Sequence, residues 1–156
     1  MHQVNWSLWT DWQQIDGLDW SLVPQSPGAY IISASQPINR AVGTDPDGYL
    51  DVGESDSLFN RLKSFHRCST QRGKTGHMAG WRFGFFNFEE HYPLSELRVR
   101  WRATGSKSDA YAAEGQVLLE YIRRHCELPP LNYKFNWQVF EEHGWNILDR
   151  DVVPEA

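Results

Sequence analysis

Two runs, PGAYIISAS at residues 27–35 and YLDVGESDSLFNRL at residues 49–62, decide the fold of this chain. The first is β-prone and is entered through a Pro-Gly pair, and the second follows the tight-turn signal Asp47-Gly48. We therefore expect two strands that pair as a hairpin. Because side chains alternate across a strand, Tyr49 and Asp51 should project from the same face of it.

The second run changes from strand to helix before it ends. Ser55 or Asp56 is available as the N-cap, and an apolar stripe follows at helical spacing, formed by Leu58, Leu62 and Phe65. Beyond this helix the sequence predicts a loop from Gly73 to Gly80. Two further β-like runs, residues 81–86 (WRFGFF) and residues 96–103 (ELRVRWRA), then bracket a turn near 91–93.

A second helix is expected to begin at Asp109, its candidate N-cap, and to run into LLEYIRRHCELPPLN at residues 118–132. Basic residues in its last turn suit the helix dipole, and Pro129-Pro130 prevents continuation. This abrupt stop places the polar Asn132 directly after an apolar leucine, which turn chemistry alone would also explain. The buried side of the helix should carry Ala110, Val117, Leu118 and Tyr121.

Both ends of the chain look like additions to this centre. Residues 5–20 repeat large apolar side chains every third position, which predicts a short amphipathic helix, and residues 135–150 mix aromatic and acidic positions and should pack as an appended element. The order ββαββα indicates a mixed α/β (α+β) fold, with a small, mainly antiparallel sheet flanked by helices. At 156 residues we expect one domain with three parts, an N-terminal Trp-rich extension (1–26), a core (27–132) and a C-terminal appendage (133–156).

Composition is that of an ordinary soluble globular protein, with 40% hydrophobic and 22% charged residues. No apolar run reaches the roughly 20 residues needed to span a membrane, and signal-peptide features are missing, so we expect a cytoplasmic protein without a membrane partner. Cys68 and Cys126 fit no CxxC pattern and are expected to be reduced thiols.

Basic residues gather in the middle of the chain. Between Arg61 and Lys107, ten Lys and Arg stand against three acidic residues, which gives +7, whereas the rest carries −12 and the whole chain −5. A basic centre between acidic flanks suits a localised anion-binding face, although solvated surface charge would look the same. A basic stripe would form if the alternating arginines of one strand faced the same way as the helix, and it would contain Arg98, Arg100, Arg102, Lys63 and Arg67.

Four polar residues stand at positions where a purely structural domain would not need them: Tyr30, Arg61, Glu114 and Asn132. A carboxylate can hold a divalent metal ion, a phenol can move a proton from water, and a guanidinium can neutralise the charge that develops on phosphorus. Such a set can cut a phosphodiester. Each residue taken singly has an ordinary structural explanation, so the information lies in their order along the chain.

In that order the residues resemble the GIY-YIG nuclease superfamily. PGAY is similar to the first half of the signature, Val52-Gly53 matches the aliphatic-glycine pair of the second half, and Arg61 lies ten residues after Asp51, at the family spacing. AAEGQVLL resembles the glutamate helix that binds metal in the family, and PPLN its closing asparagine. The resemblance runs from Gly28 to Asn132.

The resemblance implies a GIY-YIG-like fold and a divalent-metal-dependent endonuclease that hydrolyses DNA. By position, Tyr30 would act in proton transfer, Arg61 would bind the scissile phosphate, Glu114 would be the protein ligand of Mg²⁺ or Mn²⁺, and Asn132 would hold the site together by hydrogen bonds. Whether the DNA is single-stranded, duplex or branched stays open. Cutting both strands with one active site would require a homodimer or two sequential nicks.

The chain departs from the family at two positions near the active site. Asp51 stands where the family usually presents a tyrosine; it could bind a second metal ion or position water, Tyr49 could reach in from the same face, or the enzyme could be impaired. The family often has a histidine or tyrosine four residues after the arginine, whereas this chain has Phe65 there and His66 one position later, an imperfect substitute on a helix.

The spacing between the metal ligand and the closing asparagine is also longer than usual. Glu120 is therefore a competing metal ligand, and we favour Glu114 because leucines follow it in the expected pattern.

Contacts to nucleic acid are expected from Lys63 and Arg67 and from residues behind the glycine loop, where an aromatic ring can stack on a base and a guanidinium can meet a phosphate: His77, Trp81 and Arg82. A loop histidine and a core tryptophan would explain the same residues. Two other classes of function compete with the endonuclease: a catalytically impaired nucleic-acid-binding module of the same fold, and a protein-interaction domain built on the tryptophans.

Overall fold

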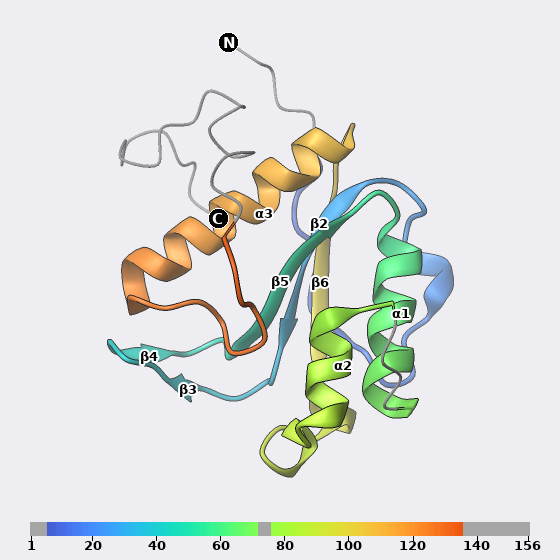
Figure 1. Ribbon diagram of the computed structural model, residues 1–156. Helices are drawn as coiled ribbons and strands as arrows, with labels where there is room; N and C mark the ends of the chain where they lie inside the picture. The colour runs from blue at the N-terminus through green and yellow to red at the C-terminus, as the bar shows by residue number, and fades with distance from the viewer. Residues whose placement is uncertain (1–5, 72–75, 136–156) are drawn as a thin grey trace.

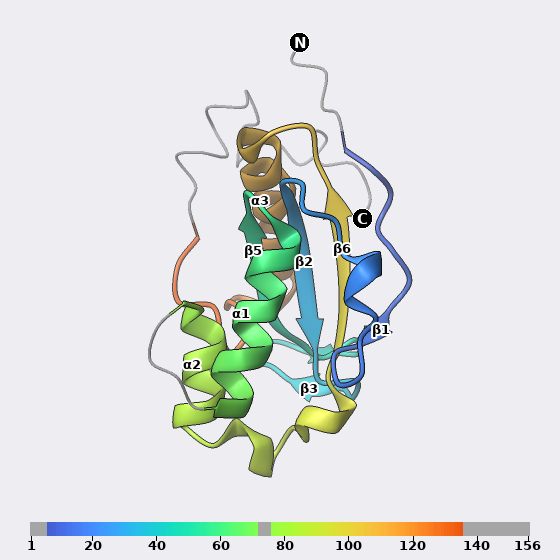
Figure 2. The same ribbon diagram turned by 90° about the vertical axis from the view of Figure 1, so that its right-hand side faces the viewer.

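The computed structural model describes residues 6–71 and 76–135 and shows a small α+β fold (Figure 1). Its centre is a four-stranded antiparallel sheet in the order β1-β6-β2-β5, formed by β1 (Gln13–Gln14), β6 (Arg98–Ala103), β2 (Gly28–Ser33) and β5 (Tyr49–Ser55). Helices α1 (Leu58–Gln71) and α2 (Met78–Phe85) cover one face, and α3 (Lys107–His125) covers the other (Figure 2). The predicted class, a mainly antiparallel sheet flanked by helices, is confirmed at this level.

Strand β2 lies between β6 and β5, and its side chains alternate between two hydrophobic clusters. Tyr30 and Ile32 join the cluster beneath α1 and α2, whereas Ile31 packs with Val52 of β5 and with Leu118 of α3. All six residues of β2 are buried, because the strand has neighbours on both edges and helices on both faces. This strand therefore holds any polar group it carries away from bulk water.

The predicted pairing of the first two strands is confirmed. Strands β2 and β5 pair from Gly28 opposite Ser55 to Ile32 opposite Asp51. The connection is longer than a tight turn, because β3 (Ile38–Asn39) and β4 (Thr44–Asp45) form a small sheet of their own between them.

A β-bulge in β5 decides which way its side chains point. Ile32 faces Asp51 but the next residue, Ser33, faces Tyr49, so Leu50 is the extra residue. Paired residues share a face of the sheet; Asp51 therefore projects toward α1 and α2, and Tyr49 joins the cluster beneath α3. The expectation that these two side chains share a face is wrong, because the bulge interrupts the alternation on which it was based.

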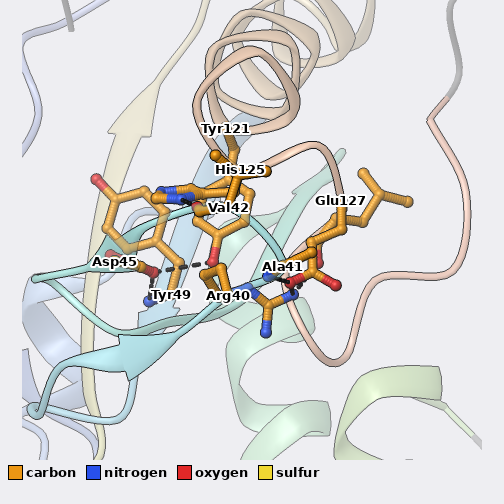
Figure 3. Close-up of polar contacts among 9 residues, drawn as sticks. Arg40, Ala41, Val42, Asp45, Tyr49, Tyr121, His125 and Glu127 are labelled. Atoms are coloured by element: carbon orange, nitrogen blue, oxygen red, sulfur yellow. Dashed lines mark hydrogen bonds and ion pairs between the residues drawn. The ribbon is translucent and has the colours of Figure 1, made fainter.

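Polar contacts fasten the β3–β4 sheet to α3 (Figure 3). The Asp45 carboxylate accepts the hydroxyl proton of Tyr121 at 3.0 Å and three backbone N–H groups, those of Asp47, Gly48 and Tyr49. Arg40 forms an ion pair with Glu127 at 3.0 Å beyond the end of the helix. These contacts hold the turn that leads into β5, and with it the start of that strand.

Helix α1 carries the predicted apolar stripe, but its N-cap lies closer to the helix than expected. The hydroxyl of Ser57, instead of Ser55 or Asp56, accepts the N–H of Asn60 at 3.3 Å. The stripe is at most 2% exposed and consists of Leu58, Leu62 and Phe65.

Helix α3 begins earlier than predicted. Ser106 is its N-cap and accepts the N–H of Asp109 at 3.1 Å, so Asp109 lies in the first turn. The helix ends at Cys126, whose φ of 56° breaks the helical path before the prolines. Its predicted buried side is confirmed for Ala110, Val117, Leu118 and Tyr121. Among the described helices none is long and apolar enough to cross a membrane. Cys68 is buried, whereas Cys126 is exposed.

The strand predicted over residues 81–86 is wrong, because residues 81–85 belong to helix α2 and Phe86 is its C-cap. Two short 3-10 helices, Phe88–Glu90 and Leu94–Glu96, flank the turn expected near 91–93. Aromatic runs of six residues fit either period, and tertiary packing selects the helix. Gly80 permits it, because a Cβ there would lie 2.8 Å from the Phe65 carbonyl oxygen of α1. The expected loop thus ends at His77, the N-cap of α2.

The N-terminal helix predicted for residues 5–20 is also wrong. Residues 6–14 run along β6, with which β1 pairs, and a turn then leads to a short 3-10 helix at Trp20–Leu22. Trp6 lies opposite Thr104 and Gln13 lies opposite Val99. The N-terminal segment therefore advances by seven residues where β6 advances by five, and two of its residues bulge out of the pairing. The tryptophans thereby share one side. They interleave with arginines at 4.8 to 5.4 Å from guanidinium carbon to ring centre, in the sequence Trp6, Arg102, Trp9, Arg100, Trp12 and Arg98. The element expected over residues 135–150 lies outside the described residues, apart from Phe135.

Candidate active site

One pocket brings together six of the polar residues that the sequence analysis selected. It has a volume of about 160 Å³ and opens beside β5, between α1, the start of α2, α3 and the segment after α3. Six side chains from six different segments line it: Tyr30, Asp51, Arg61, His77, Glu114 and Asn132. Residues a hundred positions apart in the sequence thus share a single cavity.

Tyr30 lies in the buried centre of β2, directly opposite Gly53 of β5. Its side chain is 3% exposed, and its ring lies over the glycine backbone, where an added Cβ would overlap the phenol oxygen. Gly53 therefore makes room for the phenol at the edge of the cavity. The aliphatic-glycine pair noted in the sequence has a steric purpose at this position.

A chain of hydrogen bonds with a defined direction runs through the Tyr30 hydroxyl. Tyr30 Oη donates to Asp51 Oδ2 at 3.0 Å and lies 2.8 Å from His77 Nε2. His77 Nδ1 accepts the backbone N–H of Gly80 at 3.2 Å. A backbone N–H can only donate, so Nδ1 carries no proton and neutral His77 must carry its proton on Nε2. The direction is thus from His77 to Tyr30 to Asp51.

Burial shifts the pKa of each group in this chain. It raises the pKa of the Asp51 carboxyl from 3.8 to about 6, against the hydrogen bond from Tyr30 and the positive charges of Arg61 and Arg82. It lowers the pKa of His77 to about 3, with Arg61 adding to the effect. It raises the pKa of the Tyr30 phenol well above its ordinary value. At neutral pH the chain therefore contains a neutral imidazole, a protonated phenol and a carboxylate.

Arg61 of α1 lines the pocket and brings positive charge to it. Its Nη1 donates a long hydrogen bond of 3.5 Å to the Gly76 carbonyl, which uses one of the five N–H donors of a guanidinium. Its charge acts on Tyr30, Asp51 and Glu114. A planar fork of this kind suits a bound phosphate.

Glu114 of α3 also lines the pocket, and two other carboxyl groups, those of Glu54 and Asp51, act on its charge. Burial, and then the negative charges of Glu54 and Asp51, raise its pKa to about 8, against Lys107 and Arg61. Within residues 6–71 and 76–135, no group of three or more His, Cys, Asp or Glu side chains lies close enough to hold a metal ion. A carboxyl group kept protonated by burial and by nearby negative charges is nevertheless one that a bound cation would ionise.

Asn132 explains the abrupt stop after α3. Its side-chain Oδ1 accepts the N–H of Val52 at 2.9 Å and its Nδ2 donates to the carbonyl of the same residue at 2.8 Å. The preceding Leu131 donates its N–H to the Leu50 carbonyl at 2.8 Å, and Arg82 holds the Leu131 carbonyl at 2.6 Å. The segment after the prolines therefore provides hydrogen-bond partners for backbone groups at the outer edge of β5, on either side of Asp51.

Other candidate residues lie elsewhere. Tyr49 points to the opposite face of the sheet and accepts a hydrogen bond from Arg100 at 2.7 Å. Glu120, the competing metal ligand, forms an ion pair with Arg124 at 2.7 Å in a separate cavity near Tyr49. Trp81 stacks on Phe85 with ring centres 5.0 Å apart. Tyr49, Glu120 and Trp81 are therefore absent from the lining of the pocket that contains Tyr30.

A second cavity, of about 550 Å³, lies along the outer side of α1. Its lining includes Lys63, His66 and Arg67, which the sequence analysis selected, and Trp20, which it missed. The Lys63 ammonium lies 5.6 Å from the Trp20 ring centre, and no acidic residue is among the described residues that line this cavity. It combines positive charge with an aromatic ring.

The sequence analysis expected His77 at a nucleic-acid contact and not beside Tyr30. The signal that would have placed it is its position three residues before Gly80, at the start of α2, and the misassigned helix concealed that signal. Glu54, one residue after the glycine of the second motif, was not selected at all. Its ion pair with Lys107 of α3 has no sequence signature.

Comparisons of the chain with protein-family models, with curated proteins and with solved structures found no match.

Proposed function

We propose that this protein is a GIY-YIG-like, divalent-metal-dependent endonuclease that hydrolyses DNA phosphodiester bonds. The observation that carries the proposal is the convergence of Tyr30, Arg61, Glu114 and Asn132 around one cavity. The four residues come from segments far apart in the sequence, and their chemistry and order along the chain are those of the resembled family. A coincidental set would have no reason to meet in space.

Each of these residues has a separate role in the proposed phosphodiester hydrolysis. The Arg61 guanidinium binds the scissile phosphate and offsets the charge that accumulates on it. The Tyr30 phenol lies where an attacking water could pass it a proton. Asn132 binds no substrate in this scheme; it keeps the edge of β5 in place through its paired hydrogen bonds to Val52.

Glu114 is the residue that would hold Mg²⁺ or Mn²⁺. The donor set fits a weakly held hard cation, because Mg²⁺ binds through one or two carboxylates and keeps several waters. The negative field of Glu54 and Asp51, which disfavours ionisation of Glu114, would favour a cation beside it. When bound, the ion would polarise the phosphate and acidify a bound water.

The cavity along α1 supports a polyanionic partner despite the net charge of −5. Lys63 and Arg67 lie on the same helix as Arg61, two and six residues further along. A DNA strand that reaches Arg61 could therefore continue across this cavity, with phosphates near the basic side chains and a base against Trp20.

A catalytically impaired nucleic-acid-binding module is the second candidate. Asp51 favours it, because a carboxylate stands where the resembled family presents a phenol. This module would bind DNA in a salt-sensitive way without cutting it.

The test is to incubate the purified protein with labelled single-stranded, duplex and branched DNA in Mg²⁺, Mn²⁺ and EDTA. The proposal expects metal-dependent cutting by wild type. Tyr30→Phe should abolish cutting without loss of DNA binding, whereas Tyr49→Phe, on the other face of the sheet, should still cut. Salt-sensitive binding without cutting would replace the nuclease by the binding module, and neither binding nor cutting would reject both.

A further inference from the structure

We propose that Asp51 is the proton acceptor of the site: Tyr30 passes the proton of the attacking water to Asp51, and His77 holds Tyr30 in the orientation that makes this transfer one-directional. This inference rests on the proposed phosphodiester hydrolysis. It goes further by giving the atypical carboxylate and a histidine from an unexpected helix their places in the reaction.

The hydrogen-bonding capacity of Tyr30 defines the path. A phenol has one proton to donate and two lone pairs to accept with. Its proton goes to Asp51 Oδ2 at 3.0 Å, and one lone pair meets the Nε2–H of His77 at 2.8 Å. One lone pair remains, and Tyr30 lines the cavity. A water in that cavity can therefore donate to Tyr30 while the phenol already donates to Asp51.

His77 cannot take the proton itself. Its Nδ1 is occupied by the Gly80 N–H and its Nε2 already carries a proton. The imidazole is also 4% exposed and lies near the positive charge of Arg61, so a second proton would be doubly unfavourable. Its N–H can instead stabilise the Tyr30 oxygen while that oxygen is short of a proton. His77 is thus a positioning residue, and Asp51 the acceptor.

The step balances as follows for one hydrolysis. The water oxygen forms a bond to phosphorus and loses a proton to Tyr30 Oη, while the Tyr30 proton moves to Asp51 Oδ2. The bond from phosphorus to the leaving sugar oxygen breaks, and that oxygen takes a proton from solvent. Asp51 then returns its proton to solvent, so no group is oxidised or reduced.

Charged groups of the surrounding elements define the environment of Asp51. Arg61 of α1 and Arg82 of α2 favour its carboxylate form, the charge of Asp51 in turn disfavours ionisation of Glu114 of α3, and Lys134 lines the same cavity after α3. Two cations on the sheet face to which Asp51 points help to keep a buried carboxylate available as an acceptor. A phenol at this position would have offered no acceptor of comparable basicity.

Asp51→Asn tests the inference because it keeps the shape of the side chain and removes the proton acceptor. Asp47→Asn, at an exposed position in the turn before β5, is the matched control. Single-turnover cleavage should be measured for both variants and wild type from about pH 5 to about pH 8. The wild-type rate should rise with pH as Asp51 loses its proton. We expect Asp51→Asn to cleave roughly 10²- to 10⁴-fold more slowly, to show no such rise, and to bind DNA as wild type does.

Asp51→Asn cleavage within about threefold of wild type at every pH, a factor worth under 1 kcal/mol, would overturn the inference and leave the nuclease intact. Wild-type protein that binds DNA but never cuts would reject both. A second measurement does not depend on activity: the ¹⁵N shifts of the His77 ring should report a proton on Nε2 and none on Nδ1. The opposite tautomer would reverse the hydrogen-bond direction and also overturn the inference.

Discussion

Gly53 is the residue on which the position of the Tyr30 phenol depends, because only a residue without Cβ leaves space beneath that ring. Gly53→Ala should push the phenol away from Asp51 and lower cleavage nearly as much as Tyr30→Phe does. The strain should also destabilise the fold by about 1–3 kcal/mol. Cleavage assays and urea unfolding check both parts. Wild-type cleavage by Gly53→Ala would contradict this account of the glycine.

Asp51 should reduce stability at neutral pH in proportion to its perturbed pKa. Folding raises that pKa from 3.8 to about 6, so the folded state holds the proton more tightly than the unfolded chain. The penalty is absent below pH 3.8, grows as pH rises between the two values, and is complete above about 6.

Asp51→Asn removes this penalty and should stabilise the protein by about 2 kcal/mol at pH 7, with allowance for an altered hydrogen bond to Tyr30. Urea unfolding at pH 7 and near pH 4 measures the difference. The gain should shrink at the lower pH. A variant equally stable or less stable than wild type at both pH values would show that ionisation of Asp51 does not destabilise the folded state.

At the residue scale, order and spacing sufficed to predict Tyr30, Arg61, Glu114 and Asn132 as members of one site, because each is attached to an element whose type the local pattern reveals. His77 could not be assigned in this way. Its partner Tyr30 is 47 positions away, and no local pattern encodes a contact of that range.

At the scale of elements, the open edge of β5 is held by the amide of Asn132 in place of another strand. Asn132→Ala would leave the N–H and C=O of Val52 without these partners. We expect a loss of about 1–3 kcal/mol in unfolding free energy and slower cleavage, since Asp51 lies next to Val52. Asn39→Ala, at an exposed position of β3, is the control and should change neither. Thermal unfolding that leaves Asn132→Ala unaltered would exclude this role.

The outer side of α1 should set DNA affinity without setting the rate of chemistry. Lys63→Gln and Arg67→Gln should each weaken binding and reduce the slope of log affinity against log salt by about 1, with cleavage at saturating DNA unchanged. Arg124→Gln, on α3 beside Glu120, controls for loss of charge alone. Titrations at several salt concentrations decide the matter. Salt slopes equal to wild type in both variants would remove the α1 cavity from the DNA path.

Elements were predictable where periodicity is strong and unpredictable where tertiary contacts decide. The stripe of α1 and the pairing of β2 with β5 follow from local pattern and turn chemistry. Helix α2 and the bulge at Leu50 do not, because each depends on packing against a partner far along the chain. The bulge matters most, since it sends Asp51 into the pocket and Tyr49 away from it.

At the scale of the whole molecule, the antiparallel sheet keeps the site apart from the cation–π ladder of the N-terminal tryptophans. The ladder lies along β6, on the face opposite to Tyr30. Tyr30 shares its hydrophobic cluster with Val99 and Trp101, which point from β6 to the other face of the sheet. The tryptophans recur at every third position, which suggested a helix, whereas two bulged residues in an extended segment also bring the tryptophans to one side. Overall class was therefore predictable, and the attachment of this segment was not.

Metal-dependent cleavage by wild type and by Glu114→Gln, with Glu120→Gln as the matched control, tests the central claim most directly. The account predicts that wild type and Glu120→Gln cut labelled DNA in Mn²⁺, and that Glu114→Gln binds the same DNA without cutting it. Unchanged cutting by Glu114→Gln would contradict the claim that this pocket is the active site.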